Sequence, residues 1–239
     1  MSRRDVSRRR LSCKCYVTSN KTARGRKSSD ISYGCRRHWF AGDRRIGRQI
    51  MRITGGLARG VPLVVPKGEA VRPATDAMRQ AVFSSIASWI SGAKFLDLFA
   101  GSGAYGLEAF SRGAKEGAFV EKDARTVACI GQNVAAVCKS LSRSPADLKV
   151  INADATTVSV GFAPDLIFID PPYDLITEVA PTIFAALTIS TAGKVDPLVV
   201  FEMPGQITLA PEGWTCVKRL GKGARQPTIC IFRTNRALL

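Results

Sequence analysis

Five short apolar runs, alternating with helical periodicities, constrain the fold of this chain more than any other feature. In chain order the runs cover residues 95–99, 117–121, 148–152, 166–170 and 198–202. Apolar residues at helical spacing follow the second and the fourth run, over 127–137 and 176–187. Alternating strands and helices are typical of a parallel sheet that helices cover on both faces. The pattern therefore predicts an α/β fold.

The two ends of the alternating region predict different elements. Runs 214–220 and 228–233 have no helical pattern between them, so we expect an antiparallel pair that closes the sheet. Upstream, a helix should start within residues 72–76, where Thr75 or Asp76 can accept hydrogen bonds from the free amides of its first turn. Its buried face would consist of Met78, Val82, Ile86 and Trp89. Before it, 51–54 and 61–65 flank a glycine-containing connection and predict a β-hairpin, with Pro62 on an edge.

The predicted organisation has three parts: an extension over 1–50, a β-hairpin over 51–70 and the α/β domain over 71–239. The extension contains 15 of the 35 Lys and Arg residues but three of the 19 Asp and Glu residues, which accounts for most of the net charge of +16. It lacks hydrophobic periodicity, so we expect it to be disordered. Its charge favours a polyanionic partner, most often nucleic acid. An upstream start codon, a species-specific arm and an organelle transit peptide all remain open as explanations.

Several classes of protein are disfavoured. No apolar run approaches the roughly 18 residues of a membrane-spanning helix. Seven cysteines in 239 residues are too few for a disulfide scaffold. The extension offers four possible zinc ligands at a spacing that matches no common finger, so we expect incidental thiols and no metal. These are Cys13, Cys15, Cys35 and His38.

Three acidic positions and a glycine-rich turn predict a nucleotide site. Residues 97–106 read DLFAGSGAYG, which places a GxGxxG motif between a strand and a helix. Alone, this motif fits NAD, FAD or an adenosyl cofactor equally, or a turn without a ligand. Glu121 ends the second run and can accept both ribose hydroxyls, whereas Asp123 is a candidate helix cap. Asp154 follows the third run and is a candidate for the adenine amino group or for another cap.

The end of the fourth run carries the chemistry that separates these cofactors. Asp170, Pro171, Pro172 and Tyr173 stand where open α/β sheets hold their ligands. Because neither proline has an N–H, the turn presents acceptors alone: the Asp170 carboxylate and the Pro171 carbonyl. Such a group suits the two hydrogens of an exocyclic amine on a base, and Tyr173 can stack on that base.

The same turn predicts a methyl transfer from a sulfonium donor to that amine. The lone pair of the amine is delocalised into the base, and accepting both of its hydrogens returns electron density to the nitrogen. Asp170 also stabilises the positive charge that the nitrogen acquires in the transition state. The sole histidine, His38, lies in the extension, and no cysteine follows the prolines. The core thus lacks an imidazole base, and covalent attack on a pyrimidine is disfavoured.

From Met51 onward, about four fifths of the chain, the sequence resembles the RsmD family of bacterial 16S rRNA guanine-N2 methyltransferases, which depend on S-adenosylmethionine. The matching residues are MRITGG at 51–56, Arg59-Gly60, RPATD at 72–76, DLFAGSG at 97–103 and DPPY at 170–173. Many amino-directed methyltransferases share the last two motifs. The hairpin and the RPATD stretch are more specific to the family, which typically begins near Met51.

The resemblance implies a class I methyltransferase (Rossmann-like) fold: a seven-stranded, mostly parallel sheet with helices on both faces, preceded by the β-hairpin. It implies S-adenosylmethionine as cofactor, contacted by Asp97, Phe99, Gly101, Gly103, Glu121, Asp154 and Ala155, with Arg72 and Thr75 near the pocket. It implies residues 170–173 as the catalytic turn. The implied substrate is small-subunit ribosomal RNA, naked or in an assembled particle, and we expect a cytoplasmic monomer.

Phosphate contacts should come from basic residues of the hairpin and of the tail, because the body of the chain is only mildly basic. The candidates are Arg52, Arg59, Lys218, Arg219, Lys222 and Arg225, each of which can equally be a solvated surface charge. Three other functions stay open. They are an adenine-N6 or cytosine-N4 DNA methyltransferase, an NAD-dependent oxidoreductase and a non-catalytic RNA-binding protein.

Overall fold

The computed structural model describes residues 51–66, 73–221, 223 and 227–238. All of them belong to one compact unit, Arg45–Leu239. The predicted extension over 1–50 lies outside the described residues, as do Arg72, Lys222 and Arg225. The domain boundaries at residues 50 and 70 therefore stay predictions.

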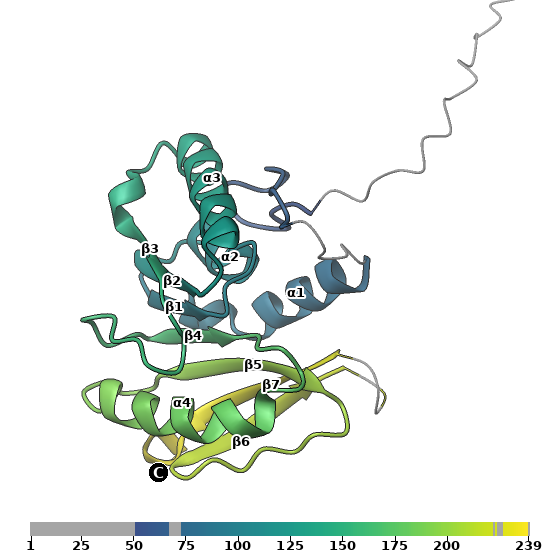
Figure 1. The fold of residues 1–239 in the computed structure, drawn as a ribbon, viewed down its shortest axis with the longest axis vertical. Coiled ribbons are helices and arrows are strands. Elements are labelled where there is room, and N and C mark those ends of the chain that lie inside the picture. The colour runs from purple at the N-terminus through teal and green to yellow at the C-terminus, as the bar shows by residue number, and fades with distance from the viewer. Residues whose placement is uncertain (1–50, 67–72, 222, 224–226, 239) are drawn as a thin grey trace, which may run out of the picture. The chain divides into compact units, whose positions relative to one another are not determined.

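The centre of the fold is a seven-stranded sheet with the order β3-β2-β1-β4-β5-β7-β6 (Figure 1). The strands are β1 (Lys94–Leu98), β2 (Glu116–Glu121), β3 (Leu148–Asn152), β4 (Leu166–Ile169), β5 (Leu198–Pro204), β6 (Trp214–Leu220) and β7 (Pro227–Thr234). Strands β1 to β5 pair in parallel, whereas β7 pairs antiparallel with both β5 and β6. This confirms the predicted mostly parallel sheet and its antiparallel closing pair.

Helices cover both faces of the sheet. They are α1 (Pro73–Ser85), α2 (Ala104–Ser111), α3 (Ala124–Leu141) and α4 (Ile176–Ser190), with 3-10 turns at Ala87–Trp89, Pro145–Asp147 and Asn235–Leu238. In β1, Phe95 packs in a core cluster with α1, α2 and α3, whereas Leu96 and Leu98 pack in a second cluster with α4. Figure 1 shows α4 lying along β5, β7 and β6. Burial on both faces explains why the strands are continuous apolar runs.

Helix α1 begins earlier than the predicted cap. It starts at Pro73, and Asp76 lies within its first turn. Proline is favoured at the first helical position, because its missing N–H needs no partner there. Asp76 instead accepts a hydrogen bond from Arg79 Nη2 at 2.8 Å.

Residues 51–66 run antiparallel to one another through a single bridge between Arg52 and Pro62. Two further backbone bonds join Ile53 N to Val61 O and Leu63 N to Met51 O. The described part of the segment therefore has one bridge where we expected two regular strands. Residues 67–70 lie outside the described residues, so the hairpin over 51–70 stays a prediction.

Gly106 in α2 and Gly131 in α3 offer a matched test of the packing beneath the glycine-rich turn. A Cβ at Gly106 would lie 2.4 Å from the Phe119 ring and 2.5 Å from the Phe95 ring, whereas a Cβ at Gly131 meets nothing within 4 Å. We expect Gly106→Ala to lower the free energy of unfolding by about 1–3 kcal/mol through overpacking. Gly131→Ala should raise it by about 0.5–1 kcal/mol, because alanine favours the helix. Urea unfolding of both variants checks this, and a gain for Gly106→Ala would contradict it.

Candidate active site

The carboxyl ends of neighbouring parallel strands bring the predicted site residues to one edge of the sheet. Leu98 of β1 pairs with both Val120 of β2 and Ile169 of β4, and Ile169 pairs with Phe201 of β5. Glu121 ends β2, the glycine-rich turn follows β1, and the turn at 170–173 follows β4. Segments more than 70 residues apart in the sequence thus meet where open α/β sheets bind ligands.

The glycine-rich turn contains three residues in the left-handed region: Phe99 at φ 57°, Gly101 at φ 52° and Gly103 at φ 76°. The two glycines adopt this conformation without strain, whereas Phe99 does so at a cost. Gly103 caps α2, which begins at Ala104. The chain therefore leaves β1 and enters α2 through a tight turn.

Asp97 is buried beneath this turn, with 3% of its surface exposed. Its Oδ2 accepts a hydrogen bond from the Gly106 amide at 2.8 Å. Burial raises the pKa of Asp97 to about 8; the Gly106 hydrogen bond opposes this rise and the nearby Glu121 adds to it. This carboxyl group thus joins the end of β1 to α2, and its predicted cofactor contact stays a prediction.

Glu121 and Asp123 have separate tasks at the end of β2. Glu121 Oε2 accepts the Gly101 amide at 3.1 Å, and its Oε1 accepts the Asp123 amide at 2.9 Å. Asp123 is the N-cap of α3, since its Oδ1 accepts the Thr126 amide at 2.8 Å. This hydrogen bond is the largest cause of the lowered pKa of Asp123. Asp123 is therefore a cap, and Glu121 is the carboxylate attached to the glycine-rich turn.

Asp154 begins a turn after β3, and this turn does not continue into a helix. Its Oδ1 accepts hydrogen bonds from Thr156 N and Thr156 Oγ1, at 2.9 and 2.6 Å. Its Oδ2 lies 2.9 Å from Lys122 Nζ. The hydrogen bonds from Thr156 are the largest cause of the lowered pKa of Asp154, and the contact with Lys122 adds to them. Ala155 is half-buried against the second core cluster, so the two residues form a polar and apolar pair at the sheet edge.

The predicted catalytic turn begins directly after β4. Asp170 is exposed and donates its backbone amide to Leu98 O at 3.5 Å, which ties the turn to the end of β1. Pro171 is buried and Pro172 exposed. Tyr173 is 43% exposed. The turn therefore presents one carboxylate and one aromatic ring at the surface, beside the glycine-rich turn.

Two residues that the sequence reasoning missed lie beside this turn. Glu202 of β5 accepts a hydrogen bond from the Tyr105 hydroxyl at 3.2 Å and another from the Tyr173 hydroxyl at 3.5 Å. Burial raises the pKa of Glu202, and the two tyrosine hydrogen bonds oppose that rise. Burial also raises the pKa of Tyr105, and Glu202 and Asp170 add to that increase. The available signal was an acid at the end of the fifth run, matching Asp170 at the end of the fourth.

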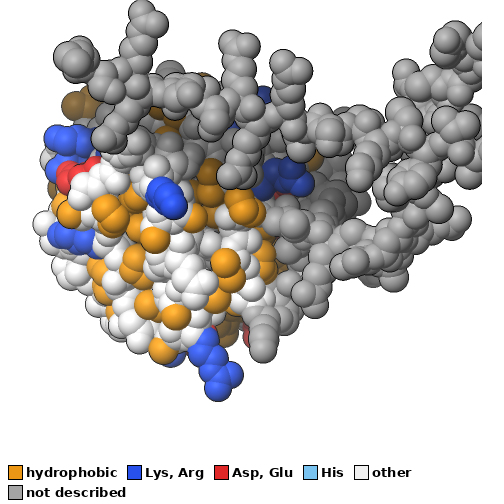
Figure 2. All heavy atoms as spheres, turned by 90° about the horizontal axis from the view of Figure 1, so that it is seen from above, with side chains coloured by type: hydrophobic (Ala, Val, Ile, Leu, Met, Phe, Trp, Pro, Cys, Tyr) orange, Lys and Arg blue, Asp and Glu red, His pale blue; other side chains and the backbone are white. Residues whose placement is uncertain are grey.

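The predicted phosphate-binding residues lie on two separate elements. Arg52 and Arg59 are exposed in the segment 51–66, and Lys218 and Arg219 are exposed on β6. Arg219 Nη2 also donates to the backbone carbonyls of Gly205 and Ile207, so part of its role is structural. On the face shown in Figure 2, the described Lys and Arg side chains are scattered among apolar and polar ones.

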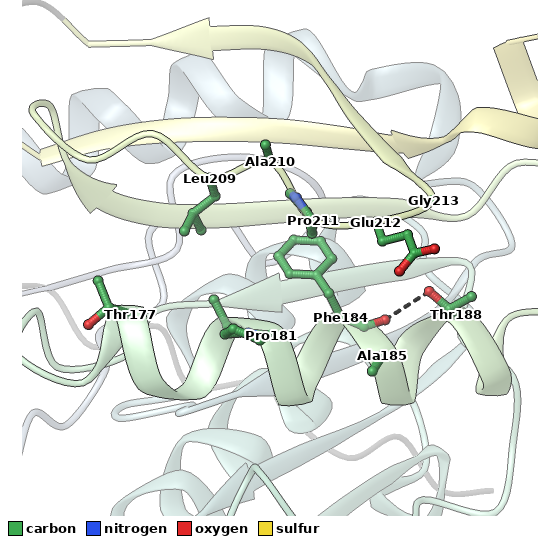
Figure 3. Close-up of a pocket in the computed structure, with 11 residues that line it drawn as sticks. Thr177, Pro181, Phe184, Ala185, Thr188, Leu209, Ala210, Pro211, Glu212 and Gly213 are labelled. Carbon is green, nitrogen blue, oxygen red and sulfur yellow. Dashed lines mark hydrogen bonds between the residues drawn. The ribbon is translucent and has the colours of Figure 1, made fainter.

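A cavity of about 700 Å³ lies elsewhere, between α4 and the loop 209–213 (Figure 3). Its walls include Phe184 and Pro181 of α4 and Pro211 of the loop. None of the predicted site residues lines it, and Glu212 is its single charged residue. A large cavity is the usual first candidate for a ligand site, but this one lacks convergent polar groups. We therefore place the candidate site at the strand ends.

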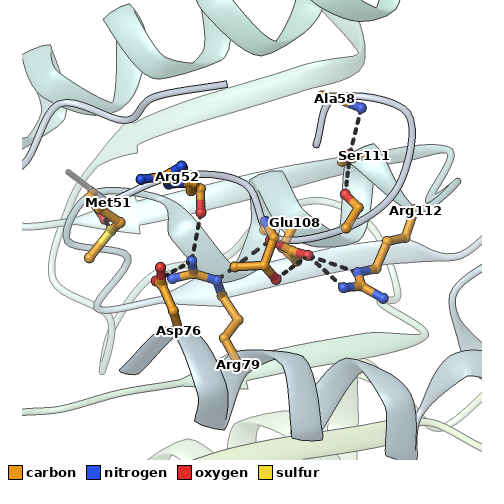
Figure 4. A network of polar contacts seen from close by, with 12 residues as sticks. Met51, Arg52, Ala58, Asp76, Arg79, Glu108, Ser111 and Arg112 are labelled. Atoms are coloured by element: carbon orange, nitrogen blue, oxygen red, sulfur yellow. Dashed lines mark hydrogen bonds and ion pairs between the residues drawn. The ribbon is translucent and has the colours of Figure 1, made fainter. Parts of the chain in front are cut away.

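A buried ionic network holds the segment 51–64 against α1 and α2 (Figure 4). Its centre is Glu108, whose side chain is fully buried. Glu108 lies 2.8 Å from Arg112 and 3.5 Å from Arg79. It also accepts the amide of Thr54 at 2.7 Å and its hydroxyl at 2.8 Å. The network thus fixes the segment that carries Arg52 and Arg59.

Asn133 of α3 connects the same segment to the glycine-rich turn. Its Oδ1 accepts the Val64 amide at 2.7 Å, and its Nδ2 donates to the carbonyls of Val64 and Ser102 at 2.9 and 2.8 Å. Because Asn133 is buried, these bonds are shielded from water. The N-terminal segment and the turn 101–103 therefore share one rigid support.

Among the residues that the structure describes, no group of three or more His, Cys, Asp or Glu side chains could hold a metal ion. No described helix is long and apolar enough to cross a membrane. The four candidate zinc ligands of the extension, Cys13, Cys15, Cys35 and His38, lie outside the described residues.

The chain is similar to proteins with known names. A family model described as conserved hypothetical protein 95 matches residues 51–231. "Ribosomal RNA small subunit methyltransferase D" of Escherichia coli K12 is 36% identical over 125 residues, which span 52% of this chain and 60% of that protein. The protein of the same name from Haemophilus influenzae is 31% identical over 182 residues, 72% of this chain and 89% of that one. The solved structure of Escherichia coli yhhF, 28% identical, covers 77% of this chain and 98% of that chain with a TM-score of 0.64.

Proposed function

Since the chain belongs to the conserved hypothetical protein 95 family, the RsmD family of methyltransferases, we propose that it methylates ribosomal RNA. The methyl group passes from S-adenosylmethionine to the exocyclic N2 amine of a guanine in the small-subunit RNA. Relatives named small subunit methyltransferase D support the RNA class. The match to the first of them spans 60% of its length, so the activity of the whole protein remains part of the proposal.

The observation that carries this proposal is the position of the acceptor-only turn. Asp170 follows β4, which pairs directly with β1, and its amide reaches Leu98 O at the end of β1. Donor and acceptor sites on adjacent strand ends are what a direct transfer requires, because alignment supplies much of the rate acceleration. Neither the oxidoreductase nor the non-catalytic function assigns a role to this turn.

The residues around the glycine-rich turn fit an adenosyl cofactor. Gly101 is half-buried and Gly103 buried, both form the turn at positive φ without a side chain, and Glu121 is oriented by the Gly101 amide. Phe99, Ala153 and Ala155 are partly buried on one core cluster and form an apolar support for a ring. We assign the ribose hydroxyls to Glu121, the adenine amino group to Asp154 and the remaining contacts to Asp97, Phe99, Gly101, Gly103 and Ala155.

In the proposed mechanism, S-adenosylmethionine supplies a methyl group on a positively charged sulfur. The Asp170 carboxylate and the Pro171 carbonyl accept the two hydrogens of the guanine amine and orient its lone pair. Asp170 stabilises the charge that develops on nitrogen during transfer. The exposed ring of Tyr173 stacks on the target base. The methylated nitrogen is strongly acidic, so it releases its extra proton to the solvent, to which the Asp170 side of the turn is open.

A transfer experiment with defined nucleic acids tests the proposal. The full chain is incubated with isotopically labelled S-adenosylmethionine and with small-subunit RNA, either naked or in particles from a strain that lacks the gene. Digestion to nucleosides should yield labelled N2-methylguanosine. Labelled N6-methyladenosine or N4-methylcytosine, or transfer to duplex DNA alone, would favour the DNA methyltransferase. Failure of all transfer together with oxidation of NADH would favour the oxidoreductase.

Glu121 and Asp123 provide a matched test of the cofactor site. Glu121→Gln replaces one of the two carboxylate oxygens that we assign to the ribose hydroxyls with an NH2 group. The dissociation constant for S-adenosylhomocysteine should therefore rise about tenfold, which corresponds to a loss of about 1.4 kcal/mol in binding free energy. Asp123→Ala should lower the free energy of unfolding through loss of the cap. It should leave the dissociation constant within about twofold. Calorimetric titration checks both values, and a larger affinity loss for Asp123→Ala would reverse the assignment.

A further inference from the structure

Glu202 is a carboxylate at the candidate site that the proposed transfer step does not use. It lies one position beyond the Ile169–Phe201 pair, so it stands beside Asp170 at the carboxyl ends of β4 and β5. Its neighbour Phe201 packs against α4, whereas Glu202 meets Tyr105 of α2. The two acids therefore lie next to each other on neighbouring strands, Asp170 directly after β4 and Glu202 near the end of β5, beside the turn to which we assign the target amine.

The contacts of Glu202 leave part of its acceptor capacity unused. The Tyr105 hydroxyl bonds one carboxylate oxygen at 3.2 Å, and the Tyr173 hydroxyl approaches the other at 3.5 Å. A carboxylate offers about four acceptor positions, so about two remain. Among the residues that the structure describes, no Lys or Arg forms an ion pair with Glu202. Holding an acid half-buried without a cation is costly for the fold, which is typical of a functional group.

The edges of the bases define what such an acceptor recognises. In guanine, the N2 amine lies beside N1–H, so two neighbouring groups are donors. In adenine and cytosine, the exocyclic amine lies beside a ring nitrogen that is an acceptor. An ionised carboxylate next to the amine-binding turn therefore attracts guanine and repels the other two. A site that hydrogen-bonds a substrate N–H rejects analogues without it strongly, because its own buried acceptor is then left unpaired.

We infer that Glu202 is a specificity-determining residue, whose carboxylate accepts N1–H of the target guanine while Asp170 and Pro171 hold its N2 amine. Tyr105 and Tyr173 orient the carboxylate, because each donates its hydroxyl to a different carboxylate oxygen. Tyr105 is itself fixed by stacking on Phe168, with ring centroids 5.4 Å apart. This inference rests on the proposed function and specifies how the site selects the base.

The base 2-aminopurine separates the two contacts, because it keeps the amine at C2 but has an acceptor at N1. The substrate is the RNA or particle that accepts the methyl group in the transfer experiment, with guanine or 2-aminopurine at the modified position. The wild-type chain should favour guanine by at least about a hundredfold in kcat/KM. The amide of Glu202→Gln can donate to N1 of 2-aminopurine. This variant should therefore lower the ratio of kcat/KM for guanine to that for 2-aminopurine at least about tenfold. The dissociation constant for S-adenosylhomocysteine should stay within about twofold.

Two further variants keep the result interpretable. Glu178→Gln makes the same change at an exposed position of α4 and should leave the preference unaltered. Glu202→Asp keeps the negative charge but places it farther from the base, because the side chain is one methylene shorter. It should therefore slow methylation of guanine without speeding methylation of 2-aminopurine. An unchanged preference in folded Glu202→Gln overturns the inference while wild-type N2 methylation still supports the proposed function. If the wild type forms no N2-methylguanosine, the proposed function itself fails. Should Glu202→Gln not fold, an unimpaired guanine rate in Glu202→Asp overturns the inference.

Discussion

Replacing Asp170 by alanine should lower the turnover number for methyl transfer at least about a hundredfold, while the dissociation constant for S-adenosylhomocysteine changes by less than about twofold. The carboxylate is exposed at the end of β4, next to the glycine-rich turn but not within it. Its loss removes an acceptor that acts on the amine and on the charge that develops in the transition state. Single-turnover kinetics with saturating cofactor measures the chemical step directly.

Asp174 provides the matched control for this substitution. It is an exposed aspartate four positions further along the same segment. Asp174→Ala should keep turnover within about threefold, because it lies beyond the rigid Pro-Pro turn. The non-catalytic alternative expects the opposite pattern: Asp170→Ala changes nothing, and deletion of residues 1–50 abolishes RNA binding. A wild-type rate in Asp170→Ala would remove the basis of the proposed mechanism.

Replacing Glu108 by alanine should lower the free energy of unfolding by about 3–5 kcal/mol. Its side chain is fully buried between Arg79, which is 4% exposed, and Arg112, which is 22% exposed. Removing the acid takes the Glu108 partner away from the buried Arg79 charge. It also leaves the amide and the hydroxyl of Thr54 without their acceptor. Urea unfolding at neutral pH measures the loss. Limited proteolysis should also show faster cleavage within 51–64, the segment that the network holds.

The pair formed by Lys94 and Glu116 is the control for an ion pair at the surface. Its atoms lie 2.6 Å apart, but the two side chains are 37% and 41% exposed. Glu116→Ala should therefore destabilise the fold far less than Glu108→Ala, since water compensates each lost charge. Similar losses for Glu108→Ala and Glu116→Ala would show that burial of the Glu108 network adds nothing to stability.

Local sequence patterns were sufficient for the strands and for the position of the turn at 170–173. The run 148–152 coincides with β3, and the strands at 117–121 and 166–170 are shifted by one residue at one end. Strands buried on both faces leave continuous apolar runs, and a Pro-Pro turn is rigid in any context. Helix ends were less certain, because several residues near Thr75 can cap a helix, and α1 began at Pro73.

Contacts between distant segments were beyond the reach of such patterns. Tyr105 and Glu202 are 97 positions apart, and Thr54 and Glu108 are 54 apart. In the sequence, Tyr105 is a variable position of a glycine motif and Glu108 an ordinary helix residue. Asp97 likewise reads as a ligand contact, and its hydrogen bond with the Gly106 amide became visible only in the structure. Periodicity and motifs report the neighbours of a residue along the chain and the face it buries, and from these the α/β sheet and the Asp170 turn follow. The pairing register of the strands and the packing of the helices determine which side chains face each other. The partners of Glu202 and Glu108 could therefore be identified only in the tertiary structure.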